Sequence, residues 1–572
     1  MSATPNVFAQ RISLLWLTAE HDTPPAKWQD AAPDLELSEI ARAMSLQPRD
    51  MTRILGVLQQ LVTDPAVIGY RQEVLEDVLQ NPALAEGLEK LLVKIEAFDR
   101  YADLGRRSDD QIHQVVYRMG ELSNYIACIG ELHTLLGSTR LRSRGLQAVR
   151  TLANSIEADE TFGRLKRELP GLLAQIENIH SVTIGVNLNA DLVPVGATLL
   201  AINSFRFKGA TSFLSRLFRG GENKPEDEGI SQLHSYPGFK EVRTLDSIII
   251  PDEVTIVDPM LAPLLKDLAQ ILDKLSKRIV QGLRAYMQVE IGFLLHLRDD
   301  LAFYLGAARM IQRIKACGLP FCRAEIAPMA ERAASLHAGY NLNLALLYSE
   351  GKVVDLSERI VLNDVQFDDQ GRIFILTGPN QGGKTVFTQG VGLAQTLFQA
   401  GLYVPASSAR LSPVDGIYTH FAVAERISQR AGRLGEEAQR LSTIFGSATR
   451  ASLLLLNESL SSTSAGESLY LARDIVRVMR RLGARAIFAT HLHELAEDCA
   501  NINAETDGDS RVASLVSIMV HDGETSKRSF KIIPSPPMGR SYAREIAAQY
   551  GISYEQLTAA LKARRLIDDD AG

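Results

Sequence analysis

A glycine-rich octapeptide at residues 378–385 combines the residue types that bind a polyphosphate. Glycines let the backbone curl so that its N–H groups face phosphate oxygens at the start of a helix. At this spacing Lys384 would reach the β- and γ-phosphates, and Thr385 would bind Mg²⁺. The alternative is a glycine-rich turn without a ligand. The loop comprises Gly378, Pro379, Asn380, Gln381, Gly382, Gly383, Lys384 and Thr385.

The segments on either side of this loop are those that a phosphate site requires. Residues 373–377 form a β-rich run, and the residues after Thr385 have a helical pattern. A strand before the loop and a helix behind it are what the binding mechanism demands. This context favours the binding of a polyphosphate over an empty turn.

A second predicted strand ends in a polar pair. Residues 453–456 are four leucines, which predict a strand buried on both faces, and Asn457 and Glu458 follow them. Glu458 would orient and deprotonate the water that attacks the γ-phosphate. Asn457 stands where an aspartate normally supports Mg²⁺, so we expect weaker Mg²⁺ binding or slow hydrolysis. The alternative is that the pair only ends a core strand.

A third predicted strand, residues 486–490, ends at His491. An imidazole is a short-range donor at neutral pH, so His491 could contact the γ-phosphate and sense its presence. A single histidine at a strand end is more often structural. Three strand ends that carry a loop, a carboxylate and a histidine favour the functional interpretation.

The composition is that of an ordinary globular protein. The chain has 572 residues, 46% hydrophobic and 23% charged, and a net charge of −7, so two to four domains are expected. No run approaches the roughly 18 apolar residues of a membrane span, and we expect a cytoplasmic protein without a membrane partner. Nucleic-acid binding would need a local basic surface. The four cysteines lack zinc-site spacing and predict free thiols.

The pattern of the chain changes character several times. Residues 37–176 are helical in pattern, and residues 181–201 are rich in β-branched residues, as is the short segment 246–250. Helical periodicity returns after Pro263 and continues towards Cys317, which predicts either a lever arm or a long helix within a bundle. From about Gly351 onwards, strands alternate with helices, which predicts a parallel sheet. A hairpin is expected at 517–533, turning at Asp522 and Gly523.

Four stretches of the second half resemble the ATPase domain of the MutS family. The similar segments are 377–385, 401–406, 453–471 and 488–495, with 363–365 and 539–543 in support. Upstream, residues 64–75 are similar to the start of the MutS core or lever domain. The β-containing insertion lies where that family places its DNA clamp.

The resemblance implies a multidomain α and α/β protein with a helical lever domain, a small β-containing clamp and a P-loop ATPase domain of ABC type. The expected divisions are an N-terminal helical segment 1–60, a core and lever domain 61–345 with the clamp at about 180–252, an ATPase domain 346–545, and a C-terminal helical segment 546–572 as a candidate for dimerisation. ATP and Mg²⁺ are the implied cofactors. The phosphate and Mg²⁺ contacts, Glu458 as base and His491 as γ-phosphate switch are roles that the family pattern implies.

The sequence departs from the family at four points. Asn457 replaces an aspartate, and residues 459–464 replace a glycine-rich turn. Residues 432–436 differ from the Ser-Thr-Phe signature that meets ATP across a dimer interface. We find no Phe-x-Glu wedge near the N-terminus and no room before Asp64 for mismatch-recognition and connector domains, so we expect DNA binding without direct mismatch reading.

The expected clamp contains one basic, aromatic-rich stretch. Arg206, Lys208, Arg216 and Arg219 are interleaved with phenylalanines and would contact phosphates without sequence specificity. A helix with solvated arginines is the alternative. The resulting hypothesis is a homodimeric, ATP-dependent protein that binds duplex or branched DNA and hydrolyses ATP slowly. Two alternatives stay open: a nucleotide-gated scaffold with weak ATPase activity, and an ATPase that binds structured RNA or ribosomes.

Overall fold

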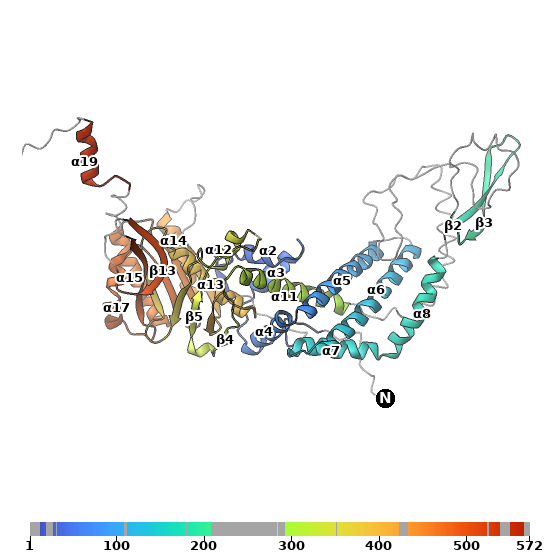
Figure 1. Ribbon diagram of the computed structural model, residues 1–572, viewed down its shortest axis with the longest axis horizontal. Helices are drawn as coiled ribbons and strands as arrows, with labels where there is room; N and C mark the ends of the chain where they lie inside the picture. The colour runs from blue at the N-terminus through green and yellow to red at the C-terminus, as the bar shows by residue number, and fades with distance from the viewer. Residues whose placement is uncertain are drawn as a thin grey trace, which may run out of the picture. The chain divides into compact units, whose positions relative to one another are not determined.

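The computed structural model falls into two compact units. The first comprises residues 1–12, 86–140 and 147–298, and the second comprises 13–85, 141–146 and 299–572. Figure 1 colours the elements from blue to red in chain order. The residues that the structure describes are 12–18, 27–29, 31–107, 111–177, 180–206, 283, 286, 292–350, 352–421, 433–522, 525–537 and 550–564.

The first unit is mainly helical. Its long helices are α5 (Pro82–Arg107), α6 (Gln111–Ser138), α7 (Arg144–Glu157) and α8 (Glu160–Glu177). Buried residues recur along α6 at three- and four-residue spacing, from Met119 through Tyr125 to Leu136. The Tyr125 ring meets Phe162 of α8 edge to face, with the ring centroids 6.0 Å apart. The helical pattern expected in this region is confirmed.

The β-rich segment after α8 forms an antiparallel hairpin of β2 (Ser181–Leu188) and β3 (Pro194–Asn203). Val182 pairs with Ile202, and the pairing runs to Leu188 opposite Pro194. The expected strand at 246–250 lies outside the described residues, as does most of the helix expected before Gly292. Helix α11 (Gly292–Ala316) continues that helical pattern.

A seven-stranded sheet organises the second unit, in the order β1-β9-β10-β11-β7-β12-β13. All neighbours are parallel except the hairpin of β12 and β13. The strands expected near 372–377, 452–456 and 486–490 and the C-terminal hairpin are confirmed, although Gly523 of its turn lies outside the described residues. The strands are β1 (Lys27–Gln29), β7 (Ile373–Thr377), β9 (Gly416–Phe421), β10 (Leu453–Asn457), β11 (Arg485–Ala489), β12 (Val512–Asp522) and β13 (Thr525–Pro534).

Helices cover both faces of this sheet, which explains why every residue of its central strands is buried. On one face α13 (Lys384–Gln399) packs on β10, and a methyl group at Gly392 would meet Leu455 at 2.8 Å. On the other face Leu454 and Leu456 join a core with α14 (Arg433–Ser447), α15 (Ala465–Leu482), α16 (His493–Glu497) and α17 (Cys499–Glu505).

A smaller four-stranded sheet lies in the same unit, in the order β4-β8-β5-β6. Its strands are β4 (Glu325–Ile326), β5 (Ala334–Gly339), β6 (Asn363–Phe367) and β8 (Ser408–Leu411), and helix α12 (Leu342–Ser349) follows β5. The side chain of Asn341 caps α12 by accepting from the backbone N–H of Leu344. Asn341 also donates to the carbonyl of Val386 in α13. The smaller sheet is thereby tied to the helix that begins at Lys384.

The N-terminal residues add an element to the large sheet that the sequence did not indicate. Strand β1 pairs with β9 at the sheet edge, and α1 (Ala31–Asp34) follows it. The Asp34 carboxylate accepts a hydrogen bond from the hydroxyl of Thr419 in β9 at 2.6 Å. The backbone carbonyl of Asp34 accepts from the side-chain amide of Gln389 in α13. Helices α2 (Leu37–Met44), α3 (Asp50–Leu58) and α4 (Pro65–Gln80) complete this region.

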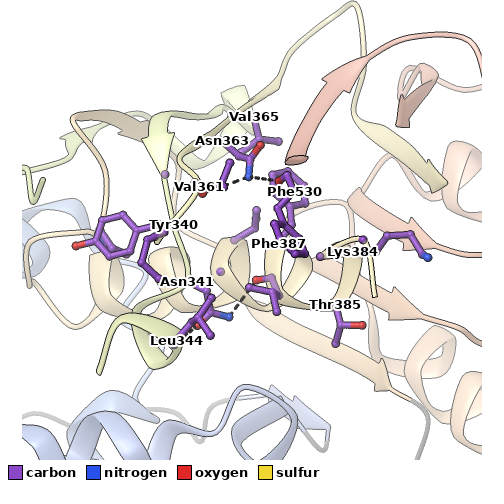
Figure 2. Close-up of a pocket in the computed structure, with 18 of the residues that line it drawn as sticks. Tyr340, Asn341, Leu344, Val361, Asn363, Val365, Lys384, Thr385, Phe387 and Phe530 are labelled. Carbon is purple, nitrogen blue, oxygen red and sulfur yellow. Dashed lines mark hydrogen bonds between the residues drawn. The ribbon is translucent and has the colours of Figure 1, made fainter. Parts of the chain in front are cut away.

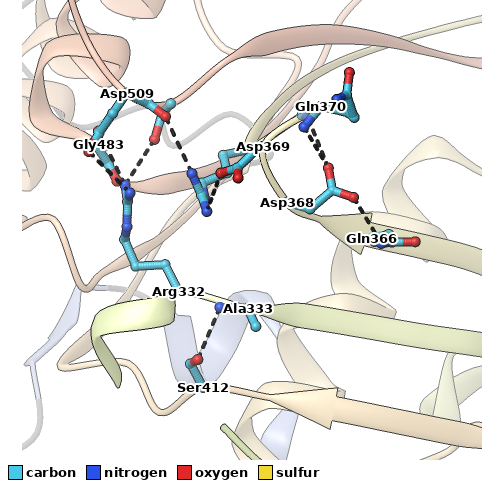
Figure 3. Close-up of polar contacts among 12 residues, drawn as sticks. Arg332, Ala333, Gln366, Asp368, Asp369, Gln370, Ser412, Gly483 and Asp509 are labelled. Carbon is cyan, nitrogen blue, oxygen red and sulfur yellow. Dashed lines mark hydrogen bonds and ion pairs between the residues drawn. The ribbon is translucent and has the colours of Figure 1, made fainter. Parts of the chain in front are cut away.

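An arginine-rich network closes the amino ends of the parallel strands (Figure 3). Arg332 pairs with Asp509 at 3.2 Å and donates to the carbonyl of Gly483. Arg372 donates to the backbone carbonyl of Asp509 and pairs with Asp369. These contacts join the residues that precede β7, β11 and β12, so they fix one end of the sheet.

The chain's last described helix is α19 (Tyr554–Ala563). Ser553 and Gln556 form a capping box at its N-terminus, which satisfies two backbone donors reciprocally. Across the residues that the structure describes, no helix is both long enough and apolar enough to cross a membrane.

The close approach of α11 to the end of α2 generates a prediction on stability. A methyl group at Gly306 would lie 1.9 Å from the backbone oxygen of Met44, and backbone cannot move aside like a flexible side chain. We expect Gly306→Ala to lower the free energy of unfolding by about 1–3 kcal/mol in chemical denaturation. The control is Gly56→Ala in α3, where the methyl group meets nothing within 4 Å and should stabilise the helix by roughly 0.5–1 kcal/mol. A Gly306→Ala protein as stable as the Gly56 variant would contradict this packing.

Candidate nucleotide-binding site

The loop between β7 and α13 has a backbone that depends on glycine. Gly378 and Gly383 have φ values of 143° and 88°, which residues with a Cβ rarely adopt. A Cβ at Gly378 would also lie 2.7 Å from the Cβ of Ser517 in β12. The Ser517 hydroxyl donates to the carbonyl of Gly382 at 2.6 Å. The loop is therefore shaped largely by its own glycines, with Gln381 also in the left-handed region at a φ of 59°, and it is held by the neighbouring strand.

Lys384 lies folded into this loop. Its Nζ donates to the carbonyls of Gly378 and Pro379, both at 3.1 Å, and only 4% of the residue is exposed. Burial lowers the pKa of the Lys384 ammonium group to about 8, and the nearby Glu458 carboxylate opposes this shift. Two carbonyl dipoles only partly replace the water that the ammonium group has lost. A phosphate group in the loop would supply the missing counter-charge.

Thr385 and Asn457 place two neutral oxygens side by side. The Thr385 hydroxyl donates to Oδ1 of Asn457 at 3.1 Å. Mg²⁺ prefers oxygen ligands and usually keeps several waters beside one or two protein ligands and substrate phosphates. The pair fits such a site, although it lacks the negative charge that a carboxylate would add.

Glu458 follows directly on β10 and faces His491 at the end of β11. Oε1 of Glu458 lies 3.0 Å from Nε2 of His491, and both side chains are partly exposed. The backbone N–H of Glu458 donates to the carbonyl of Ala489 at 2.8 Å. The carboxylate is thus oriented by a hydrogen bond to a second side chain at the same edge of the sheet.

The structure brings together the five candidate residues that the sequence placed at three separate strand ends. Lys384, Thr385, Asn457, Glu458 and His491 lie at the carboxyl ends of β7, β10 and β11. Of the remaining loop residues, Pro379 and Gly382 are buried and Asn380 and Gln381 are exposed. Gln381 accepts from the guanidinium of Arg528 in β13 at 2.8 Å.

A pocket of about 380 Å³ opens beside the loop (Figure 2). Val361, Asn363 and Phe530 line one side, and Phe387 and Thr385 belong to the helix on the other. Asn363 fixes this wall, because its amide donates to the carbonyl of Phe530 at 3.1 Å and accepts from the N–H of Ile532. An apolar pocket with an aromatic wall suits a planar heteroaromatic base next to the phosphate loop.

The nucleic-acid candidates cannot be assembled into a site from the described residues. Arg206 is exposed just after β3, beside Phe205, which is also exposed. Lys208, Arg216 and Arg219 lie outside the described residues. Of the altered segment at 432–436, Gly432 also lies outside them, and Arg433 begins helix α14.

Sequence reasoning did not find two residues that shape this site. Ser517 is 135 residues away from the loop carbonyl that it binds, and Phe530 belongs to the hairpin strand β13. Neither residue lies in a recognisable motif. Only the order of strands in the sheet, with β12 beside β7, brings Ser517 to the loop.

Two protein families match the chain in separate parts. Residues 374–565 match MutS domain V, and residues 63–317 match the MutS2 N-terminal domain. The first match contains every candidate residue of the nucleotide-binding site from Gly378 to His491. The second contains helices α5 to α8 and the hairpin of β2 and β3.

Individual relatives include three proteins named DNA mismatch repair protein MutS or MutS 1. The protein from Chlorobium phaeobacteroides is 25% identical over 445 residues, which are 73% of this chain and 49% of the relative. The protein from Chlorobium phaeovibrioides is 32% identical over 222 residues, 38% of this chain and 24% of the relative. The protein from Haloarcula marismortui is 30% identical over 207 residues, which are 35% of this chain and 22% of the relative.

The chain spans about half the length, or less, of these curated relatives. The matched families nevertheless account for both the helical part and the part that contains the phosphate loop. With a MutS2 N-terminal domain followed by MutS domain V, the chain is a MutS-related protein.

Proposed function

We propose that the protein is an ATP-dependent DNA-binding protein in which a MutS-type P-loop domain hydrolyses ATP slowly. The observation that carries the proposal is the meeting of Lys384, Thr385, Glu458 and His491 at one edge of the sheet, next to an apolar pocket. ATP hydrolysis needs a phosphate loop, a metal-binding hydroxyl, a general base for the attacking water and a pocket for the nucleobase.

The residues divide the chemistry between them. Lys384 and the loop N–H groups bind the β- and γ-phosphates and stabilise the charge that develops on them. Glu458 orients the attacking water and accepts its proton, and His491 contacts the γ-phosphate. Thr385 and Asn457 would hold Mg²⁺, which supplies charge neutralisation at the phosphates. Because Asn457 is neutral, we infer that metal binding is weaker and hydrolysis slower than with a carboxylate at this position.

The DNA part of the proposal rests on family membership and on the clamp interpretation. Relatives of the chain are named for DNA mismatch repair. The hairpin of β2 and β3 within residues 180–252 is the clamp that would contact DNA, with the exposed Arg206 as one contact. A homodimer in which ATP closes two ATPase domains is the assembly that this family implies.

Two substitutions test the nucleotide site directly. Lys384→Ala removes the charge that neutralises the phosphates, so we expect ATP binding to be lost in calorimetry. Glu458→Ala leaves the phosphate contacts intact, so ATP should still bind while single-turnover hydrolysis falls by about 10²-fold or more. Equal turnover by the Glu458 variant and the wild type would remove Glu458 from the mechanism. Tight ATP binding with hydrolysis at background in the wild type would instead favour a nucleotide-gated scaffold.

The lowered pKa of Lys384 predicts a pH dependence of ATP binding. Below pH 8 the ammonium group is charged and attracts the triphosphate, and above pH 8 it is neutral in the free protein. ATP affinity should therefore fall as pH rises through 8, and binding at pH 8.5 should take up a proton. Calorimetry at pH 8.5 in two buffers of different ionisation enthalpy measures this uptake, and pH 7 is the control. A binding heat at pH 8.5 that is the same in both buffers would contradict the prediction.

A competition assay tests the nucleic-acid partner. Homoduplex, mismatched and branched DNA and structured RNA compete for the protein at several salt concentrations. We expect duplex or branched DNA to win, and Arg206→Ala to reduce the salt dependence by about one phosphate contact. Arg140→Ala, another exposed arginine of the helical unit, is the matched control. Preferred binding of RNA would support a structured-RNA or ribosome-binding ATPase instead, and a mismatch preference would assign direct mismatch reading to this chain.

A further inference from the structure

The turn that carries Glu458 has an unusual backbone. Glu458 and Leu460 have φ values of 54° and 65°, in the left-handed region that residues with a Cβ rarely occupy. No glycine occurs between Glu458 and Gly466, so glycine cannot supply the conformational freedom that this turn requires. Strained residues of this kind persist only where the surrounding structure holds them in place.

The two strained residues are held from opposite sides. The N–H of Glu458 donates to Ala489 of β11, and the carbonyl of Leu460 accepts from the hydroxyl of Ser468 in α15 at 2.6 Å. The Leu460 side chain is buried in the core beneath the sheet. These contacts secure the ends of the turn and leave Ser459 between them.

Ser459 is bound by His420, which lies in β9 on the far side of β10. The Ser459 hydroxyl lies 2.7 Å from Nδ1 of His420 and donates to the His420 carbonyl at 3.3 Å. A hydroxyl has a single proton, so Nδ1 is the donor when the hydroxyl donates to the carbonyl. Ser459 is 5% exposed and His420 is 1% exposed, so water does not compete for this hydrogen bond.

Strand pairing fixes the position of the His420 backbone next to β10. His420 is paired with Leu456 in the register of β9 and β10, two residues before Glu458. The His420 side chain therefore binds Ser459, the residue that directly follows Glu458 at the end of β10. The same strand end is thus fixed by β9, by β11 and by α15.

We propose that the hydrogen bond between His420 and Ser459 is a positioning device that holds the Glu458 carboxylate in its catalytic orientation. The proposal rests on the proposed hydrolysis of ATP at this site. Neither residue is among those that line the pocket, and Ser459 directly follows Glu458, so both act through Glu458. Loss of the hydrogen bond lets the turn relax, which lowers the rate of the chemical step and leaves the phosphate contacts unchanged.

The test compares Ser459→Ala, Ser459→Thr and the control Ser461→Ala, whose serine is exposed two residues along the same turn. Single-turnover hydrolysis and ATP dissociation constants are measured for each protein. We expect Ser459→Ala to slow hydrolysis by about three- to tenfold, with the dissociation constant within about twofold of the wild type. Ser459→Thr keeps the hydroxyl and should restore most of the rate, and Ser461→Ala should match the wild type.

A double-mutant cycle with His420→Phe, which removes Nδ1, keeps the proposal testable if one variant folds poorly. The variant with both His420→Phe and Ser459→Ala should hydrolyse ATP no more slowly than the slower single variant, because both changes remove the same hydrogen bond. Additive losses, a Ser459→Ala rate equal to the wild type, or a loss of affinity that matches the loss of rate would each overturn the positioning role. Hydrolysis at background in the wild type would instead overturn the proposed ATPase itself, and the positioning role with it.

Discussion

The parallel register of three strands is the constraint on which the candidate site depends. Leu376, Ala489 and Asn457 lie in one row across β7, β11 and β10. The next residue of each strand therefore emerges at the same height, and main-chain hydrogen bonds continue the row, from Thr490 to Leu376 and from Glu458 to Ala489. A slip of one residue in any pair would turn every side chain of that strand to the opposite face. The phosphate loop, Glu458 and His491 could not then meet.

The amino ends of the strands supply the rigidity that this register needs. Arg485 is fully buried at the start of β11, where burial lowers the pKa of its guanidinium to about 9. It donates to the carbonyls of Ala333, Ser412 and Pro413, which belong to segments flanking the smaller sheet. A buried cation is tolerated only with such partners, and removing them would leave it uncompensated. The amino ends of the strands are therefore fixed by polar contacts, while the carboxyl ends are left open for ligands.

Much of this arrangement could be predicted from the sequence, for a physical reason. Strands buried on both faces have nearly continuous apolar runs, and the leucines of β10 and the runs in β7 and β11 showed this signal. Strand β1 did not, because three residues at a sheet edge carry no periodicity. Ser517 and Phe530 were also invisible, since their roles arise from strand order rather than from neighbouring residues. Pairings between distant segments, such as His420 with Ser459, leave no local pattern at all.

The phosphate loop and the turn that carries Glu458 hold their left-handed backbone in different ways. The phosphate loop obtains its left-handed backbone from Gly378 and Gly383, which carry little conformational penalty there, and from one residue with a side chain, Gln381, whose φ is 59°. The turn after β10 reaches the same region of φ with Glu458 and Leu460 and must be held by neighbours. Two of its three tethers are serine hydroxyls, Ser459 to His420 and Ser468 to Leu460. The phosphate loop depends largely on its glycines and on β12, whereas the turn after β10 keeps its form only while β9, β11 and α15 stay in place. The orientation of Glu458 is thereby coupled to the packing of α15 and β9, and the shape of the phosphate loop depends less on either.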